Sequence, residues 1–412
     1  MLAMITPEPE FASPALPRLG PVTPAERVEI LDIFRGFALL GVLVANMRGF
    51  SGPMMAYFDH TLMWQEPANR AAQFVVDAFV SGKFITIFSF LFGVGFAIQM
   101  ERAEARPAGF LGRRFGALMA LGLVHIFLLW WGDILLAYSV FGFALLLFRR
   151  REPKTLLWWA AVLYLFPLLG FGMGALAAHF NPEAMKQPPA DPAELARLIR
   201  VYATGGYGQI LIERAKEAGQ ALMFVPFFGP RLLGLFLLGT WVWRRGILQG
   251  LANRETLLRR CQLWGFAVGL PLGLGGEVFM LVKAPVMSQP SLDGLVYFAV
   301  NSVAVPALSA AYLATVARLG AGGAGRKRVH WFAPVGRMAL TNYLTQTVVC
   351  TMIFYGYGLG WFGKVGPIAG LGLALAIYGA QMGLSRWWLG RWRQGPAEAA
   401  WRWVTYAGWR RD

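Results

Sequence analysis

Residues 30–47 read "ILDIFRGFALLGVLVANM" and carry only two charged side chains, Asp32 and Arg35. An α-helix rises about 1.5 Å per residue, so this run can cross most of the roughly 30 Å hydrocarbon core of a bilayer. A backbone surrounded by lipid must satisfy its own hydrogen bonds, and a helix does so within one segment. The run therefore predicts a transmembrane α-helix.

Nine further apolar runs follow this one, and the chain as a whole is poor in charge. Of its 412 residues, 57% are hydrophobic and 15% are charged, whereas a soluble globular chain carries about 25% charged residues. This composition excludes a disordered chain and argues against a soluble enzyme. The sequence predicts an all-α polytopic transmembrane bundle of about ten spans. The nine further runs are 71–99, 112–130, 132–148, 155–178, 221–243, 262–282, 293–317, 332–354 and 365–385.

The net charge of +16 comes from short basic clusters between the apolar runs. With the N-terminus placed inside, 25 Lys and Arg residues fall in inside segments and nine in outside segments. Basic residues are concentrated in the cytoplasmic loops of membrane proteins. We therefore expect both termini to be cytoplasmic, a multi-pass location in the cytoplasmic (inner) membrane, a lipid bilayer as partner, and no nucleic-acid partner.

Composition also divides the chain along its length. Residues 179–220 form an outer segment that is amphipathic and is interrupted by a Gly-Gly pair. This pattern predicts two short helices over the outer mouth of the bundle. The alternative is that the segment is a solvated connector. The two cysteines and four scattered histidines lack the spacing of metal ligands, so no metal site is predicted. The expected regions are a disordered cytoplasmic tail (1–29), an N-terminal transmembrane bundle (30–178), the outer loop (179–220), a C-terminal transmembrane bundle (221–385) and a basic cytoplasmic tail (386–412).

Two polar residues share one face of the first span. Asn46 follows Arg35 by eleven residues, which returns it to nearly the same helical face about 16 Å farther along the axis. Ionisable groups inside a span commonly mark function. The alternative is structural: Arg35 extends toward the inner interface, and Asn46 bonds a neighbouring helix.

A second polar pair lies in "GLVHIFLLWWGDILLAY", residues 122–138. His125 lies twelve residues beyond Arg113, about 18 Å from the inner side, and Asp133 follows at the outer turn. A carboxylate beside a histidine can orient it as a general base. Asp133 can equally cap the next helix, where its charge suits the helix dipole. Both roles can hold together.

Other polar residues are weaker candidates. His60 lies beside Asp59 in the first outer loop. Lys83 interrupts the second span, and a buried ion pair with Asp77 is a sufficient structural explanation for it. Asn342 and Gln346 are four residues apart on the ninth span and face the same way.

Several of these runs resemble a known bacterial family. "ILDIFRGFALLGVLVAN" (30–46), "SFLFGVGFAIQ" (89–99) and residues 122–138 are similar to the YeiB-like membrane proteins. "VGRMALTNYLTQTVVCTMIFYGYGLGWFG" (335–363) and "RWRQGPAEAAWRWVTY" (391–406) resemble the C-terminal domain of unknown function that defines that family. The resemblance covers nearly the whole chain from Arg27, and it supplies no established activity.

The first spans are also distantly similar to heparan-α-glucosaminide N-acetyltransferase and to integral-membrane acyltransferases that modify surface sugars. In those families an arginine of the first span is followed eleven positions later by a polar active-site residue, which corresponds here to Arg35 and Asn46. The resemblance implies a catalytic histidine in the first outer loop, best matched by His60 although the spacing is a few residues longer. That departure leaves His125 as a competitor.

These residues form two layers. Arg35, Arg113 and Arg114 make an inner basic layer that suits the phosphates of cytoplasmic acyl-coenzyme A as co-substrate. The outer layer consists of Asn46, His60, His125 and Asp133. We therefore expect an acyltransferase acting on an extracytoplasmic hydroxyl or amine of a sugar or envelope component.

Two other functions stay open. One is a transporter or exporter of a small polar solute or lipid, with a substrate cavity at Lys83, Asn342 and Gln346. The other is a non-catalytic membrane scaffold. The sequence leaves the oligomeric state open, with a homodimer as one possibility.

Overall fold

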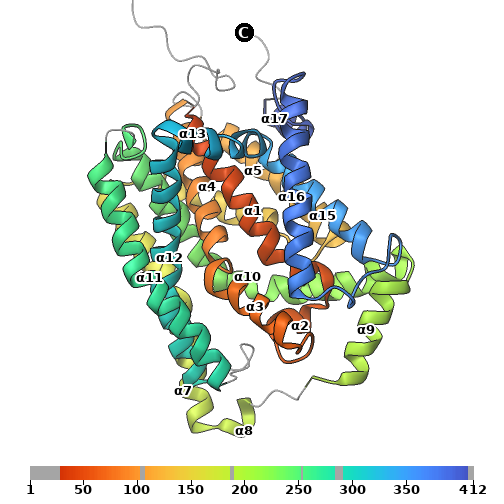
Figure 1. Ribbon diagram of the computed structural model, residues 1–412. Coiled ribbons are helices and arrows are strands. Elements are labelled where there is room, and N and C mark those ends of the chain that lie inside the picture. The colour runs from red at the N-terminus through yellow and green to blue at the C-terminus, as the bar shows by residue number, and fades with distance from the viewer. Residues whose placement is uncertain (1–27, 103–106, 186–189, 252–253, 284–290, 407–412) are drawn as a thin grey trace, which may run out of the picture.

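The computed structural model describes residues 28–102, 107–185, 190–251, 254–283 and 291–406. Within these ranges the regular structure is helical and contains no strand. The predicted all-α polytopic bundle is confirmed (Figure 1). Eight helical segments of the described chain are long and apolar enough to cross a membrane: Glu29–Ser51, Pro67–Glu101, Gly109–Leu129, Pro153–Phe180, Tyr207–Arg244, Glu255–Lys283, Leu292–Gly320 and Pro367–Leu389.

The other two predicted spans form shorter helices. Helix α6 (Leu135–Leu145) continues into a 3₁₀ turn, Leu146–Phe148, and α15 (Ala339–Phe354) follows α14 (Phe332–Arg337). Both leave part of one face exposed, at Val140 and Phe143 in the first and at Val348 and Met352 in the second. The long helices are α1 (Glu29–Ser51), α4 (Lys83–Arg102), α5 (Pro107–Val124), α7 (Pro153–Phe180), α10 (Tyr207–Arg244), α11 (Glu255–Lys283), α12 (Leu292–Gly320) and α16 (Pro367–Leu389). The remaining short helices are α2 (Met54–Phe58), α3 (Pro67–Phe79), α8 (Pro182–Met185), α9 (Pro192–Thr204), α13 (Gly323–Val329) and α17 (Pro396–Tyr406).

The second predicted span, 71–99, is broken into α3 and α4. Gly82 lies at the break with a φ of 80°, a left-handed conformation that disfavours side chains with a Cβ atom. The break places Lys83 at the first residue of α4 instead of within a continuous helix.

The Gly-Gly break predicted within 179–220 does separate two helices, but the second of them is not short. Helix α9 is separate and amphipathic, but residues 207–220 are the first turns of the 38-residue helix α10. Pro226 and Pro230 lie inside α10 without ending it. Prolines are tolerated in membrane helices because neighbouring groups satisfy the freed carbonyls. Helix α9 lies at the opposite end of the bundle from α17 (Figure 1).

The expected basic tail, 386–412, is largely folded. Helix α16 continues to Leu389, and α17 packs against α5 and α15. The indole Nε1 of Trp401 donates a hydrogen bond to the main-chain oxygen of Arg114 at 3.0 Å. The predicted N-terminal tail lies almost entirely outside the described residues.

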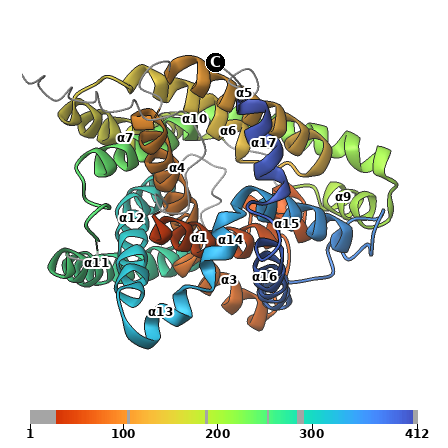
Figure 2. The same ribbon diagram turned by 90° about the horizontal axis from the view of Figure 1, so that it is seen from above.

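Helix α1 lies at the centre and joins the two expected bundles into one (Figure 2). It packs against α4 on one side and against α14, α15 and α16 on the other. Gly36 and Gly336 allow the backbones of α1 and α14 to touch, since a Cβ atom on Gly36 would overlap Phe332 and one on Gly336 would overlap Asp32. This close contact fixes the neighbouring Arg35.

Candidate donor cavity and histidine pairs

A cavity of about 430 Å³ opens between α1, α4, α5, α6, α14, α15 and α17. Its residues come from the end of the bundle where α1 begins and α17 lies, the end that the basic loops assign to the cytoplasm. Four arginines from four different helices line it: Arg35, Arg114, Arg337 and Arg402. Three carboxylates also line it, from Asp32, Glu101 and Glu398, so the mouth has a small excess of basic residues and is assembled from distant parts of the sequence.

Farther from that mouth the lining becomes apolar. Leu39 and Val42 of α1 line it, and Tyr138 and Tyr343 contribute aromatic rings. The Tyr138 hydroxyl lies 2.7 Å from Ser89 Oγ, so this polar group is already hydrogen-bonded inside the bundle. A ligand that fits both parts carries anionic groups at one end and a slender, less polar arm at the other.

Two of the three predicted basic residues line this cavity. Arg35 Nη1 lies 3.1 Å from Asp32 Oδ1, and its side chain is partly exposed. Arg114 stacks over the Trp401 ring, with its Cζ 3.6 Å from the ring centroid, an arrangement that favours a cation. Arg113 is exposed and is not among the described residues that line the cavity.

His125 lies behind the deep end of the cavity. Its ring stacks on the cavity-lining ring of Tyr343 at a centroid distance of 5.1 Å and an interplanar angle of 30°. It begins a single π-helical turn, His125–Leu129, that ends α5. Such turns are rare and often occur at functional sites.

Both nitrogens of His125 have a polar neighbour. Nδ1 lies 2.9 Å from Asp133 Oδ1, although the pair lacks the alignment of a hydrogen bond, and Nε2 lies 2.9 Å from Thr347 Oγ1. The side chains of His125 and Asp133 are wholly buried. Asp133 Oδ2 also accepts a hydrogen bond from the main-chain N–H of Leu136 at 2.7 Å, so the carboxylate caps α6 as well. Both sequence-based interpretations of Asp133 therefore describe its contacts.

His60 has a different carboxylate partner from the neighbouring Asp59. Its Nδ1 lies 3.4 Å from Asp77 Oδ2 of α3, and 39% of its side chain is exposed. Asp59 instead accepts hydrogen bonds from Thr61. Desolvation holds the pKa of His60 below its ordinary value, although the Asp77 carboxylate acts in the opposite direction. This desolvation favours the neutral form of His60.

The remaining predicted residues lie outside the cavity lining. Asn46 is half-buried, one turn of α1 beyond Val42. Lys83 is buried, and its Nζ donates to the main-chain oxygen of Asp77 at 2.6 Å instead of pairing with that carboxylate.

Asn342 and Gln346 tie α15 to α16. Asn342 Nδ2 donates to Val335 O at 3.1 Å and to Ser385 Oγ at 3.0 Å. Gln346 Nε2 donates to Gln381 Oε1 at 2.9 Å. The three side chains suggested for a transport cavity, these two and Lys83, are therefore in two separate places and are each hydrogen-bonded to protein.

Sequence reasoning missed the part of the site that comes from the last quarter of the chain. Tyr343 and Thr347 lie one residue beyond Asn342 and Gln346 on α15, and this shift turns them toward His125. Arg402 and Trp401 lie in a motif that carried the family resemblance but no assigned role. Within the described ranges, no three His, Cys, Asp or Glu side chains come together as metal ligands.

Comparison with known proteins places this architecture among bacterial relatives. The family model described as "Protein of unknown function (DUF418)" matches residues 242–408. The chain is 36% identical to "Uncharacterized protein YxaH" of Bacillus subtilis (strain 168), over 95% of this chain and 97% of the relative. It is 30% identical to "Uncharacterized protein YeiB" of Escherichia coli (strain K12), over 92% of this chain and 96% of the relative. No solved structure matches the chain.

Proposed function

Because the chain belongs to the YeiB-like family of bacterial membrane proteins, with its DUF418 region at residues 242–408, we propose that it is an acyltransferase of the cytoplasmic membrane. The donor is a cytoplasmic acyl-coenzyme A, and the acceptor is an extracytoplasmic hydroxyl or amine. The observation that carries this proposal is the cavity that changes from a basic mouth to an apolar interior and ends against the ring that covers His125.

The donor's chemistry matches the two parts of the cavity. Guanidinium groups bind phosphates through parallel N–H donors, and Arg35 and Arg114 provide them from facing helices. The pantetheine arm is narrow and only weakly polar, so it suits the interior past Leu39 and Val42. The thioester then lies near Tyr343, with Asn46 one turn farther along α1 as a candidate donor to the oxyanion.

His125 is the base that the geometry favours. Asp133 beside Nδ1 favours a proton on that nitrogen, so Nε2 is left as the basic one, facing the Thr347 hydroxyl. The acceptor's proton passes through that hydroxyl to Nε2 while the acceptor oxygen or nitrogen bonds the acyl carbon. The C–S bond breaks, coenzyme A leaves as a thiolate, and the proton on His125 returns to it. His60 is the alternative base, because desolvation favours its neutral form and it is open to the outer side.

Titration of purified protein with coenzyme A in a calorimeter tests the donor site. We expect Arg35→Ala and Arg114→Ala each to weaken binding about tenfold, or about 1.4 kcal/mol. Arg113→Ala is the matched control, since this neighbouring arginine does not line the cavity. Equal affinity in all three variants, or no binding by the folded wild-type chain, would remove coenzyme A from this cavity.

A further inference from the structure

A second arginine site lies at the opposite, outer end of the bundle. Arg214, in the third turn of α10, is wholly buried. Its Nη1 donates a hydrogen bond to the main-chain oxygen of Leu128. Its Nε and Nη2 have no hydrogen-bond partner among the described residues. Buried donors in proteins are nearly always paired, so two unpaired ones on a single side chain call for an explanation.

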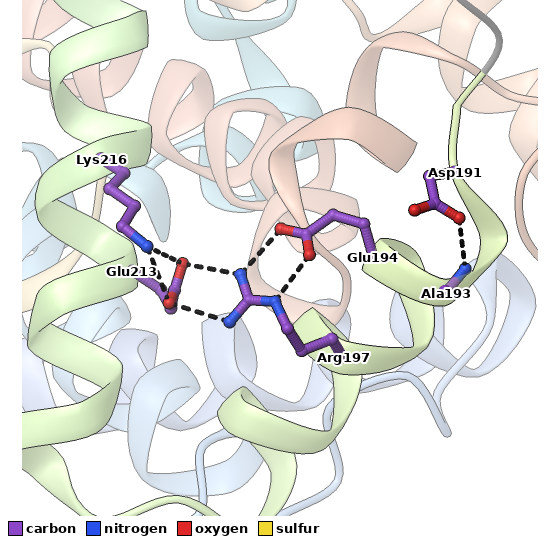
Figure 3. Close-up of polar contacts among 6 residues, drawn as sticks. All are labelled: Asp191, Ala193, Glu194, Arg197, Glu213 and Lys216. Carbon is purple, nitrogen blue, oxygen red and sulfur yellow. Dashed lines mark hydrogen bonds and ion pairs between the residues drawn. The ribbon is translucent and has the colours of Figure 1, made fainter.

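The two unpaired nitrogens lie on one edge of the guanidinium. Nε and Nη2 present parallel N–H groups at the spacing of two carboxylate or phosphate oxygens. Arg197 of α9 shows the same chemistry when it is satisfied (Figure 3). Its Nε and Nη2 lie 2.6 Å and 2.7 Å from the two oxygens of Glu194, and Glu213 occupies its other edge. Arg214 has the same pair of parallel N–H donors, but no carboxylate of the described residues accepts from them.

No carboxylate of the described residues pairs with this edge. Glu217, one turn along α10, is the nearby carboxylate, but it accepts hydrogen bonds from the Tyr202 hydroxyl at 2.5 Å and from the main-chain N–H of Met54 at 2.9 Å. The rings of Tyr207 and Tyr355 flank the guanidinium, each with its centroid 5.6 Å from Cζ. The surroundings therefore stabilise the cation without filling its bidentate edge.

We propose that the Nε–Nη2 edge of Arg214 binds a carboxylate or phosphate group of the acceptor. Leu128, which receives the Arg214 hydrogen bond, belongs to the same π-helical turn as His125, so the anion site is joined to the proposed base by that turn. Tyr207 lies two helical turns before Arg214, is partly exposed, and donates to the same Leu128 oxygen. The role in acceptor recognition rests on the proposed acyl transfer, whereas anion binding by itself does not.

The experiment measures the melting temperature of the full chain in detergent with glucuronate, glycerol phosphate or neutral glucose, at equal ionic strength and without acyl donor. We expect both anions, but not glucose, to raise the melting temperature of the wild-type chain and of Arg197→Gln. Arg214→Gln should lose that rise. Arg214→Lys keeps the charge without the pair of parallel N–H donors, and its half-saturating anion concentration should be at least about tenfold higher. The Arg214→Lys variant provides the test if Arg214→Gln does not fold.

The outcomes separate this site from the proposed reaction. An unchanged anion response in folded Arg214→Lys would assign the response to another site, and no response in the wild-type chain would make Arg214 a purely structural residue. Preference for one anion over the other identifies whether the acceptor carries a carboxylate or a phosphate. If the protein binds anions at Arg214 but transfers no acyl group, the proposed acyltransferase activity is refuted and the anion site is not.

Discussion

The protein holds two histidine–carboxylate pairs, and they lie in opposite environments. His125 and Asp133 are wholly buried 2.9 Å apart, on a π-helical turn and at the start of a helix. His60 and Asp77 lie 3.4 Å apart, and the histidine is in a loop with 39% of its side chain exposed. A base works best when its surroundings fix its position. The buried pair has that rigidity and packs against Tyr343, which lines the cavity, whereas the exposed pair has easier access to an outer acceptor.

Replacing each histidine gives the largest difference between the two pairs. We expect His125→Gln to lower the rate of acyl transfer at least about 100-fold, because the general base is lost. His60→Gln should stay within a few-fold of wild type. The measurement is the initial rate of label transfer from acetyl-coenzyme A to an envelope extract, with coenzyme A binding as the control for folding. The opposite ranking would move the base to His60.

Replacing each carboxylate should give a smaller difference in the same direction. Asp133→Asn retains an oxygen for the Leu136 N–H but removes the charge beside His125, and groups that orient a functional histidine are typically worth 10- to 100-fold. Asp77→Asn should leave the transfer rate unchanged. An equal loss in both variants would show that neither carboxylate acts through its histidine.

The hydroxyl of Thr347 tests whether the buried pair reaches the substrate by a relay. Thr347→Val removes the hydroxyl that lies 2.9 Å from His125 Nε2, and we expect about a tenfold loss of rate. Thr347→Ser restores the hydroxyl and should recover most of the activity. If Thr347→Ser is as slow as Thr347→Val, the methyl group rather than the hydroxyl is what matters, and the contact is a packing contact.

The smallest predicted effect concerns pH and the exposed pair. Because the folded state lowers the pKa of His60, the unfolded chain takes up the proton more readily. The neutral histidine therefore contributes stability above its ordinary pKa of about 6.5, and this contribution is lost as the pH falls through the lower folded value. The melting temperature of His60→Gln should fall less than that of the wild-type chain between pH 8 and pH 5. An equally steep fall would mean that other groups control the acid response.

Sequence periodicity was sufficient for the transmembrane architecture and for one of the two pairs. His125 and Asp133 are eight residues apart beside the predicted outer turn, and the reversal of the chain there places them at similar depth. Asp77 reaches His60 because the first outer loop folds onto α3, which apolar periodicity does not reveal. Thr347 and His125 are 222 residues apart in sequence, and no local pattern predicts that contact.

Only two of the four arginines that line the cavity could be predicted from the sequence, for the same reason. Arg35 and Arg114 are adjacent to apolar runs and were recognisable as an inner basic layer. Arg402 lines the cavity because α17 packs against α5 and α15. Trp401 on Arg114 holds it there, as does Glu398, which accepts hydrogen bonds from the main-chain N–H groups of Leu340 and Thr341. The basic composition of residues 386–412 predicted a tail. Composition alone does not reveal the tertiary contacts that a segment makes.

The sidedness of donor use tests the central claim most directly. Membrane vesicles that contain the protein are prepared with either the cytoplasmic or the outer face exposed to the medium. Labelled acetyl-coenzyme A is then added to that medium. The cavity between α1, α5 and α17 predicts that label is transferred only when the cytoplasmic face is exposed, and that His125→Gln abolishes this transfer. Equal transfer in both orientations, or solute flux without any acyl transfer, would contradict the account.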